Sequence, residues 1–423
     1  MCKRKKKQTI HSQQKIATAQ NKNLFFSKIK SICIQLGKPH AFQLIPRSKL
    51  DLMFATRFTA FKFEPAAGSC IPKHVINTFH FILQYNLKEY SIVIAANEIG
   101  IPLDLFFTAG FVFMHHIKNL KDNEFPKSSQ LKQEFNDLLD PEECYKKACF
   151  ELFDFINAFG LEFNNLGGHM YWVNYELKNP KEGKSQLRNI LKVNSMTPER
   201  IHVSFKGNYR PAFRVSWPSA QVEPDLVSIS PEKLCVPVGN TKDDLKVYIQ
   251  SHALVRISER LDCLHPGIAH YFVYLSLKDL VSINHHGKLM FEYKIFGIKA
   301  GYLVADIKNN KVVIRTFLFL TNNGTPEAEN LKELTGLTLA DKKFLAIDKL
   351  STFMNAGFAE NIHLLNLFDQ AGCKSLLELY NRIQHLIEQD KARSGSDAFI
   401  ARYLQLEKEK EPELIFDEIQ EEY

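Results

Sequence analysis

The sequence contains no pair of cysteines separated by two residues, and its eight cysteines are scattered along 423 residues. This spacing is not typical of a disulfide framework and predicts reduced thiols. A secretory signal is also missing, because the basic residues 3–7 are followed by polar residues and not by an apolar segment. The most apolar stretch contains Glu98, Pro102 and Asp104, whereas a membrane span needs about 20 uncharged residues. We therefore expect a cytoplasmic protein that does not enter a membrane.

Sequence signatures of the common enzyme classes are missing as well. The chain has no GxSxG, HExxH, GxGxxG or GxxxxGK sequence and no paired-carboxylate motif. Cys263 lies near several histidines, but their spacings match no zinc-binding pattern. The histidines in question are His265, His270, His285 and His286. We therefore predict neither a metal site nor a cofactor.

Acidic residues are absent from the first 50 residues, which contain 12 lysines and arginines. Residues 401–423 show the opposite bias, with eight acidic residues against three basic ones. A basic segment attracts phosphate groups whatever their sequence context. We interpret residues 1–22 as a disordered basic arm that contacts RNA or DNA, or alternatively as a solvated tail that aids solubility. The sequence does not identify a protein partner.

The overall pattern of apolar residues predicts an α+β fold. The composition, 45% hydrophobic and 24% charged, is that of a globular chain with a sizeable core. Helical spacing dominates the early part of the chain, and alternation typical of strands begins near Gly167. The predicted divisions are a helical domain (23–165), a β-rich segment and linker (166–240), a helix-plus-antiparallel-meander unit (241–322) and a helical C-terminal region with an acidic tail (323–423).

The helix-plus-meander unit is the most informative part of the chain. We expect Asp243 and Asp244 to cap a helix that runs to about Leu261, followed by a second helix over Ile268–Leu280. Three strands are predicted next, at residues 289–296, 302–307 and 312–320, and a two-residue Asn-Asn turn separates the last two.

The first helix of this unit is amphipathic and carries one histidine and two arginines on a single face. At about 100° per residue, His252, Arg256 and Arg260 fall within about 80° of one another. The apolar residues Leu254, Ile257 and Leu261 point the other way. A neutral imidazole can accept a proton, and guanidinium groups stabilise charge on a phosphoryl group. That chemistry suits metal-free RNA cleavage, although a solvated helix face has the same pattern.

This helix and the following meander resemble the RelE-type and BrnT-type ribonuclease toxin superfamily. The resemblance covers about residues 248–321 and rests on the His252-x3-Arg256-x3-Arg260 spacing and the order of elements. It implies a compact α+β fold and metal-independent endoribonuclease activity. It also implies that His252, Arg256 and Arg260 lie at the site, with Arg315 and Thr316 as the polar strand residues. These toxins are usually small, whereas this unit is embedded in a longer chain.

A second surface combines basic and aromatic residues along a predicted hairpin with a turn at Gly207 and Asn208. Such surfaces stack bases and neutralise phosphate, but an ordinary strand pair with one core face has the same composition. The residues are Lys206, Tyr209, Arg210, Phe213, Arg214 and Trp217. Two hypotheses follow for the whole chain. One is a metal-independent endoribonuclease of toxin-like fold, and the other is a non-catalytic protein that binds nucleic acid or protein, such as a component of a mobile genetic element.

Overall fold

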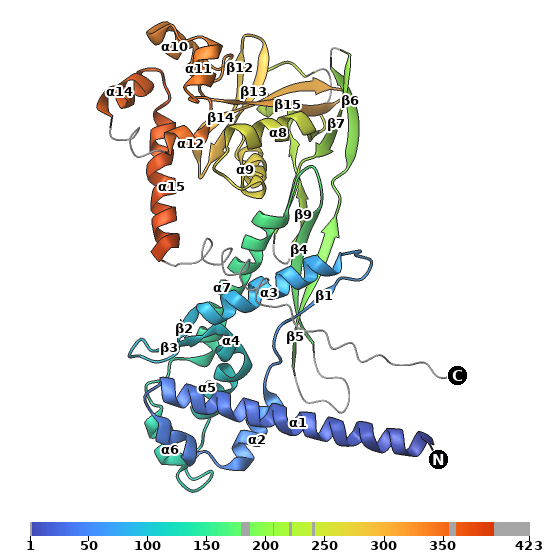
Figure 1. The fold of residues 1–423 in the computed structure, drawn as a ribbon, viewed down its shortest axis with the longest axis vertical. Helices are drawn as coiled ribbons and strands as arrows, with labels where there is room; N and C mark the ends of the chain where they lie inside the picture. Colours follow the sequence, from blue (N-terminus) through green and yellow to red (C-terminus); the bar gives the residue numbers. More distant parts are fainter. Residues whose placement is uncertain are drawn as a thin grey trace. The chain divides into compact units, whose positions relative to one another are not determined.

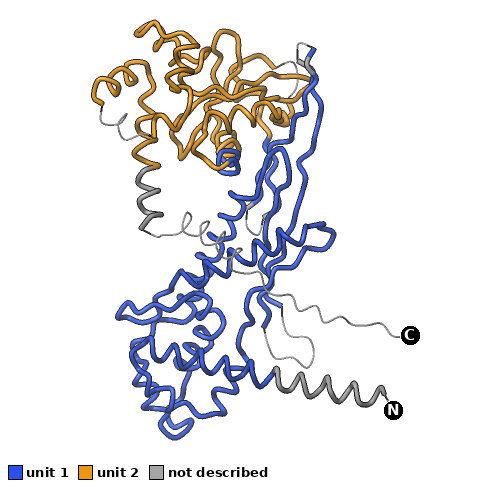
Figure 2. Tube along the Cα trace, viewed as in Figure 1, with its two compact units in different colours: residues 1–227, 266–271 blue, residues 228–265, 272–423 orange. Residues whose placement is uncertain are grey.

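The computed structural model describes residues 2–178, 187–205, 207–219, 222–238, 242–354 and 361–392, with only the backbone described for 2–17, 205, 208, 219, 222 and 384–392. The chain divides into two compact units (Figure 2). Unit 1 comprises residues 1–227 and 266–271, and unit 2 comprises residues 228–265 and 272–423. About 47% of the chain is helix and 26% is strand, which confirms the predicted α+β class. Among the described residues, no helix combines the length and the apolar composition that a membrane crossing requires.

Along the chain, unit 1 begins with helices that have short strands between some of them, and strand hairpins follow (Figure 1). Its helical elements are α1 (Cys2–Gln35), η1 (Pro39–Leu44), α2 (Arg47–Thr56), α3 (Lys73–Glu89), α4 (Leu103–Leu105), η2 (Phe106–Gly110), α5 (Phe111–Lys118), α6 (Ser128–Glu134) and α7 (Pro141–Phe163). Its strands are β1 (Lys62–Pro65), β2 (Ser91–Val93), β3 (Gly100–Pro102), β4 (Met170–Lys178), β5 (Arg188–Met196), β6 (Arg200–Phe205), β7 (Asn208–Arg214), β8 (Ser216–Ser219) and β9 (Val222–Leu226).

The N-terminal segment differs from the expected disordered arm, because residues 2–22 belong to helix α1. No glycine or proline precedes Gly37, and lysine, glutamine and alanine favour helix, so the helix continues through the polar segment. Its last turns are anchored by buried Phe25, Ile29 and Ile32. The helix ends before Gly37, which has a φ of 73° and therefore a conformation that suits glycine.

Phenylalanine rings fill the core of unit 1 where α3 packs against α7. Phe79 of α3 is 1% exposed and stacks on Phe159 of α7, with ring centroids 5.7 Å apart. Helix α7 begins at Pro141, and Asp140 caps it by accepting hydrogen bonds from the backbone N–H groups of Glu142 and Glu143. Strands β4 and β5 pair antiparallel, β1 pairs parallel with β5, and the β6–β7 hairpin turns at Gly207 as expected.

Unit 2 is built on five strands in the order β12-β13-β14-β15-β11, with β10 paired to β11. Its elements before the meander are β10 (Ser228–Ile229), η3 (Pro231–Lys233), β11 (Leu245–Gln250), α8 (Ser251–Arg260) and α9 (Pro266–Lys278), whose first six residues are counted with unit 1. The meander consists of β12 (Ser282–His285), β13 (Lys288–Ile295), β14 (Ile298–Lys308) and β15 (Lys311–Phe319). The later helices are α10 (Pro326–Thr335), α11 (Leu339–Phe344), α12 (Leu350–Phe353), α14 (Ile362–Gln370) and α15 (Lys374–Ala392).

Residues 245–250 form a strand where a helix was predicted. We expected a helix from Asp244 to about Leu261, but the first half of that segment is strand β11. Tyr248 and Ile249 pair parallel with β15 and are fully buried. A strand buried on both faces is a continuous apolar run, which periodicity does not distinguish from a buried helix. The predicted second helix and the three predicted strands correspond to α9, β13, β14 and β15, whereas β12 was not predicted.

Candidate functional site

Helix α8 begins directly at the end of strand β11 and packs against β15 (Figure 1). Its apolar side is buried as predicted, with Leu254 7% exposed and Ile257 and Leu261 fully covered. Gln250 has an extended backbone and stands at the N-cap position, and its side chain makes no capping hydrogen bond. The first backbone N–H groups of α8 therefore form the type of helix terminus that binds anions.

The two arginines of the predicted site are both engaged in ion pairs. Arg256 is exposed and its Nη1 lies 2.5 Å from Oε2 of Glu259, one turn along the same helix. Arg260 donates to the carboxylate of Asp348, and the two side chains are 15% and 3% exposed. Burial lowers the pKa of Arg260, and the neighbouring Arg256 lowers it further. A guanidinium remains charged at neutral pH, so Arg260 serves first to neutralise a buried carboxylate.

An open cleft in unit 2 is lined by Arg256 and Arg260. Its other lining residues are Glu259, Asp262, Lys343, Asp348 and Lys349. Four cations face three carboxylates there, so an anion that binds Arg256 or Arg260 competes with their existing ion pairs. His252 does not line this cleft, and it lies two turns before Arg260, about 12 Å along the helix axis.

Arg315 and Thr316 lie at a β-bulge in strand β15. Val304 of β14 pairs with Thr316, whereas the next residue, Ala305, pairs with Ile314, so Arg315 is the extra residue of β15. Both Arg315 and Thr316 are half-buried, although they are consecutive in a strand whose neighbours Ile314 and Phe317 are buried. A bulge redirects a side chain in this way and is often found beside active sites. The guanidinium of Arg315 pairs with Asp306, which is also partly exposed.

The strand register brings this bulge to the start of α8. The last pair of the parallel β11–β15 ladder is Ile249 with Ile314, so Gln250 and Arg315 are the next residues on the two strands. His252 follows two residues later in the first turn of α8 and is half-buried. The register therefore places the backbone of His252, Arg315 and Thr316 near the carboxyl end of β11, whereas Arg256 and Arg260 lie further along α8 and line the open cleft.

Gln250 is a candidate site residue that was not predicted from the sequence. It is 2% exposed, and its side-chain Nε2 has no hydrogen-bond partner among the described residues. A buried amide without a hydrogen-bond partner lowers the stability of the folded state by about 1–3 kcal/mol, so Gln250 destabilises unit 2 at this position. The available signal was a polar residue at the end of the apolar run Val247–Ile249.

The basic and aromatic hairpin does not form one surface. Arg214 is 4% exposed and donates to the carbonyl of Val227, and Trp217 is 6% exposed beside Tyr271, so both belong to the core of unit 1. Tyr209 is 71% exposed and stacks on His202, with ring centroids 5.2 Å apart. Phe213 and Arg210 are half-buried, and the predicted contact Lys206 lies outside the described residues.

The chain was compared with known proteins at three levels. No protein-family model, no curated protein and no solved structure matches it.

Proposed function

We propose that unit 2 is a metal-independent endoribonuclease whose reaction centre lies where β11 ends and α8 begins. The observation that carries this proposal is the register of β11 and β15, which places His252 just after Gln250 and the bulged residues Arg315 and Thr316 at the same end of the sheet. It is supported by the side-chain Nε2 of Gln250, which has no hydrogen-bond partner among the described residues and does not cap the start of α8. The resemblance of residues 248–321 to ribonuclease toxins agrees with this location.

In the proposed reaction the RNA 2′-hydroxyl attacks the adjacent phosphorus atom. His252 accepts the hydroxyl proton, the 2′-oxygen–phosphorus bond forms, and the bond from phosphorus to the 5′-oxygen breaks. The departing 5′-oxygen takes a proton from the imidazolium or from water. Arg315, the Gln250 amide and the α8 N–H groups bind the negative phosphate oxygens. The products carry a 2′,3′-cyclic phosphate and a free 5′-hydroxyl.

The remaining predicted residues have supporting roles in this proposal. Arg256 lies in the cleft and can exchange its exposed partner Glu259 for a phosphate. This exchange costs little, because an exposed ion pair contributes only about 0–1 kcal/mol to stability. Arg260 positions α8 through Asp348 and does not contact substrate. The basic residues carried by α1 add affinity for RNA irrespective of its sequence. Cytoplasmic location is part of the proposal and agrees with the seven described cysteines being free thiols.

The test is cleavage of total RNA in EDTA by the full-length wild type and by His252→Ala, with His363→Ala as a control for loss of an exposed histidine. We expect the wild type and His363→Ala to produce 2′,3′-cyclic phosphate ends, and His252→Ala to cleave at least about 100-fold more slowly. Absence of cleavage by the wild type, or equal rates for the three proteins, would refute the proposal.

A second candidate function is non-catalytic binding of nucleic acid. It is favoured by one observation, that Arg256, Arg260 and Arg315 all have carboxylate partners, which reduces the positive charge available to stabilise a transition state. A binding protein needs only transient exchange of such pairs. Salt-dependent RNA binding without cleavage by the wild type would support this candidate.

A further inference from the structure

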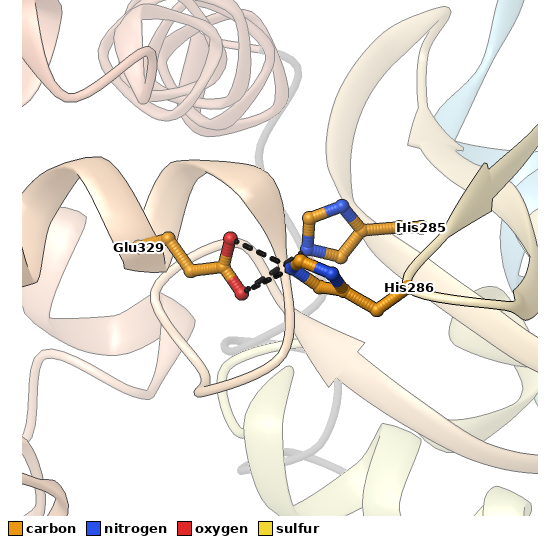
Figure 3. A group of neighbouring side chains, drawn as sticks. All are labelled: His285, His286 and Glu329. Atoms are coloured by element: carbon orange, nitrogen blue, oxygen red, sulfur yellow. Dashed lines mark hydrogen bonds and ion pairs between the residues drawn. The ribbon is translucent and has the colours of Figure 1, made fainter.

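His285, His286 and Glu329 form a cluster in unit 2, away from the proposed reaction centre (Figure 3). His285 ends strand β12, His286 occupies the turn to β13, and Glu329 lies in the first turn of α10. Strand β12 is at one end of the five-strand order of unit 2 and β11 is at the other. The cluster was not visible in the sequence, because 42 residues separate His286 from Glu329.

The potential ligand atoms of the cluster converge on one point. Nε2 of His285 lies 3.3 Å from Oε1 of Glu329, and Nε2 of His286 lies 3.1 Å from the same oxygen. The ligand atoms of all three residues lie within 4.8 Å of one another. A tetrahedral zinc ion at about 2.0–2.1 Å from each ligand separates its ligand atoms by about 3.3 Å. The two distances from Glu329 to the imidazole nitrogens therefore already match the ligand spacing of a zinc site.

Hydrogen bonds do not satisfy every polar side-chain atom of this cluster. Nε2 of His285 is buried, and Glu329 does not satisfy it with a hydrogen bond of regular geometry. The two imidazole rings lie side by side, with centroids 4.2 Å apart. Both rings can direct a nitrogen lone pair at one divalent cation, and the carboxylate of Glu329 supplies the opposite charge.

We propose that His285, His286 and Glu329 bind a zinc ion. Two imidazoles and one carboxylate suit zinc, whereas calcium and magnesium prefer sites made of oxygen ligands. Three protein ligands leave a fourth position for water or another ligand. The side chains of His286 and Glu329 are 66% and 45% exposed, so an ion can enter from solvent. The bound ion joins the β12–β13 hairpin to α10.

The turn that carries His286 makes a selective test possible. His286 and Gly287 have φ values of 50° and 74°, which define a type I′ turn. Asparagine followed by glycine is the preferred pair for such turns, so His286→Asn removes the imidazole while keeping the hairpin stable. His286→Ala would instead place alanine at a positive φ and strain the backbone. Weaker zinc binding by that variant would then not be separable from distortion of the turn.

The experiment uses the full-length chain stripped with EDTA and then freed of chelator. Zinc is titrated against a chromophoric competitor for the wild type, His286→Asn, Glu329→Gln and the control His363→Asn, an exposed histidine of α14. We expect the wild type and His363→Asn to bind zinc with the same affinity. Each cluster variant should bind at least about 10-fold more weakly, since even the loss of residues that only support metal ligands weakens sites by that factor.

Cobalt binding separates this site from the exposed thiols Cys70, Cys235 and Cys263. We expect the wild type to show the visible bands of tetrahedral cobalt without a thiolate charge-transfer band. Unchanged zinc affinity in His286→Asn, a thiolate band, or no zinc binding by the wild type would overturn the proposal. The ribonuclease test is made in EDTA, so the two proposals succeed or fail separately.

Discussion

Arg260 of α8 donates to the carboxylate of Asp348, which is 2% exposed and lies between α11 and α12. Two residues further on, Asp262 accepts hydrogen bonds from the backbone N–H and the hydroxyl of Ser351, at 3.0 and 2.8 Å. The C-terminal end of α8 is thus attached to the start of α12 by two carboxylate contacts. Arg260, chosen from the sequence as a phosphate ligand, is in the structure paired with a buried carboxylate.

Replacing Asp348 with alanine is expected to destabilise unit 2 strongly. The change leaves the mostly buried Arg260 without its partner, and breaking a buried pair in this way costs about 3–5 kcal/mol. Arg256→Ala is the control, because it removes an exposed pair worth less than about 1 kcal/mol. The free energy of unfolding, measured by urea denaturation, distinguishes them. Equal losses of unfolding free energy in the two variants would show that the buried Arg260–Asp348 pair stabilises unit 2 no more than the exposed Arg256–Glu259 pair does.

Gln250→Met is expected to raise stability and lower RNA cleavage together. Methionine has a similar shape and removes the unpaired buried amide, so the free energy of unfolding should increase by about 1 kcal/mol. Loss of a phosphate-binding donor should slow cleavage by at least about 10-fold. Gln370→Met, an exposed position of α14, should change neither quantity. A Gln250→Met protein that is less stable would contradict the assignment of an unpaired amide.

Glu64 is expected to make unit 1 sensitive to acid. Its carboxylate contacts Lys192 at 2.7 Å and Lys62 at 3.1 Å, and these hydrogen bonds lower its pKa to about 2. A carboxyl group whose pKa is lower in the folded state contributes stability above its unfolded pKa of about 4.3. That contribution is lost as the pH falls from there through about 2.

The measurement is urea denaturation of the wild type, Glu64→Gln and the exposed control Glu151→Gln between neutral pH and pH of about 2. Glu64→Gln should be less stable by about 2 kcal/mol at neutral pH, and this difference should shrink towards zero at the acid end. A constant difference across the range would show that the charge of Glu64 is not what stabilises the β1–β5 pair.

Gly301→Ala is expected to disrupt the sheet of unit 2. A Cβ atom at Gly301 would lie 2.3 Å from the carbonyl oxygen of Leu318 and 2.7 Å from the ring of Phe317, on the paired strand β15. Backbone atoms in a sheet do not move aside easily, so a loss of about 3 kcal/mol or more is expected. Gly168→Ala is the matched control, since its nearest atom would be 3.6 Å away. Equal melting temperatures for Gly301→Ala and Gly168→Ala would contradict the close contact between Gly301 and β15.

The second helix and three strands of the meander in unit 2 could be predicted from local patterns, and one error is instructive. The apolar stripe Leu254, Ile257 and Leu261 faces the core as predicted, because helical spacing and burial agree there. Residues 245–250 were predicted as helix and are strand, because a run such as Val247–Ile249 is compatible with either structure. Only its partner β15, more than 60 residues later, decides between them.

The candidate sites show the same division between sequence and tertiary structure. The sequence by itself determined that one face of α8 carries His252, Arg256 and Arg260, since helical geometry places every fourth residue on one side. The tertiary structure decided which of these cations is neutralised by a buried carboxylate, that a bulge exposes Arg315 beside Thr316, and that His285, His286 and Glu329 meet. Contacts of this kind depend on strand register and on the packing of helices distant in the chain, which local spacing does not specify.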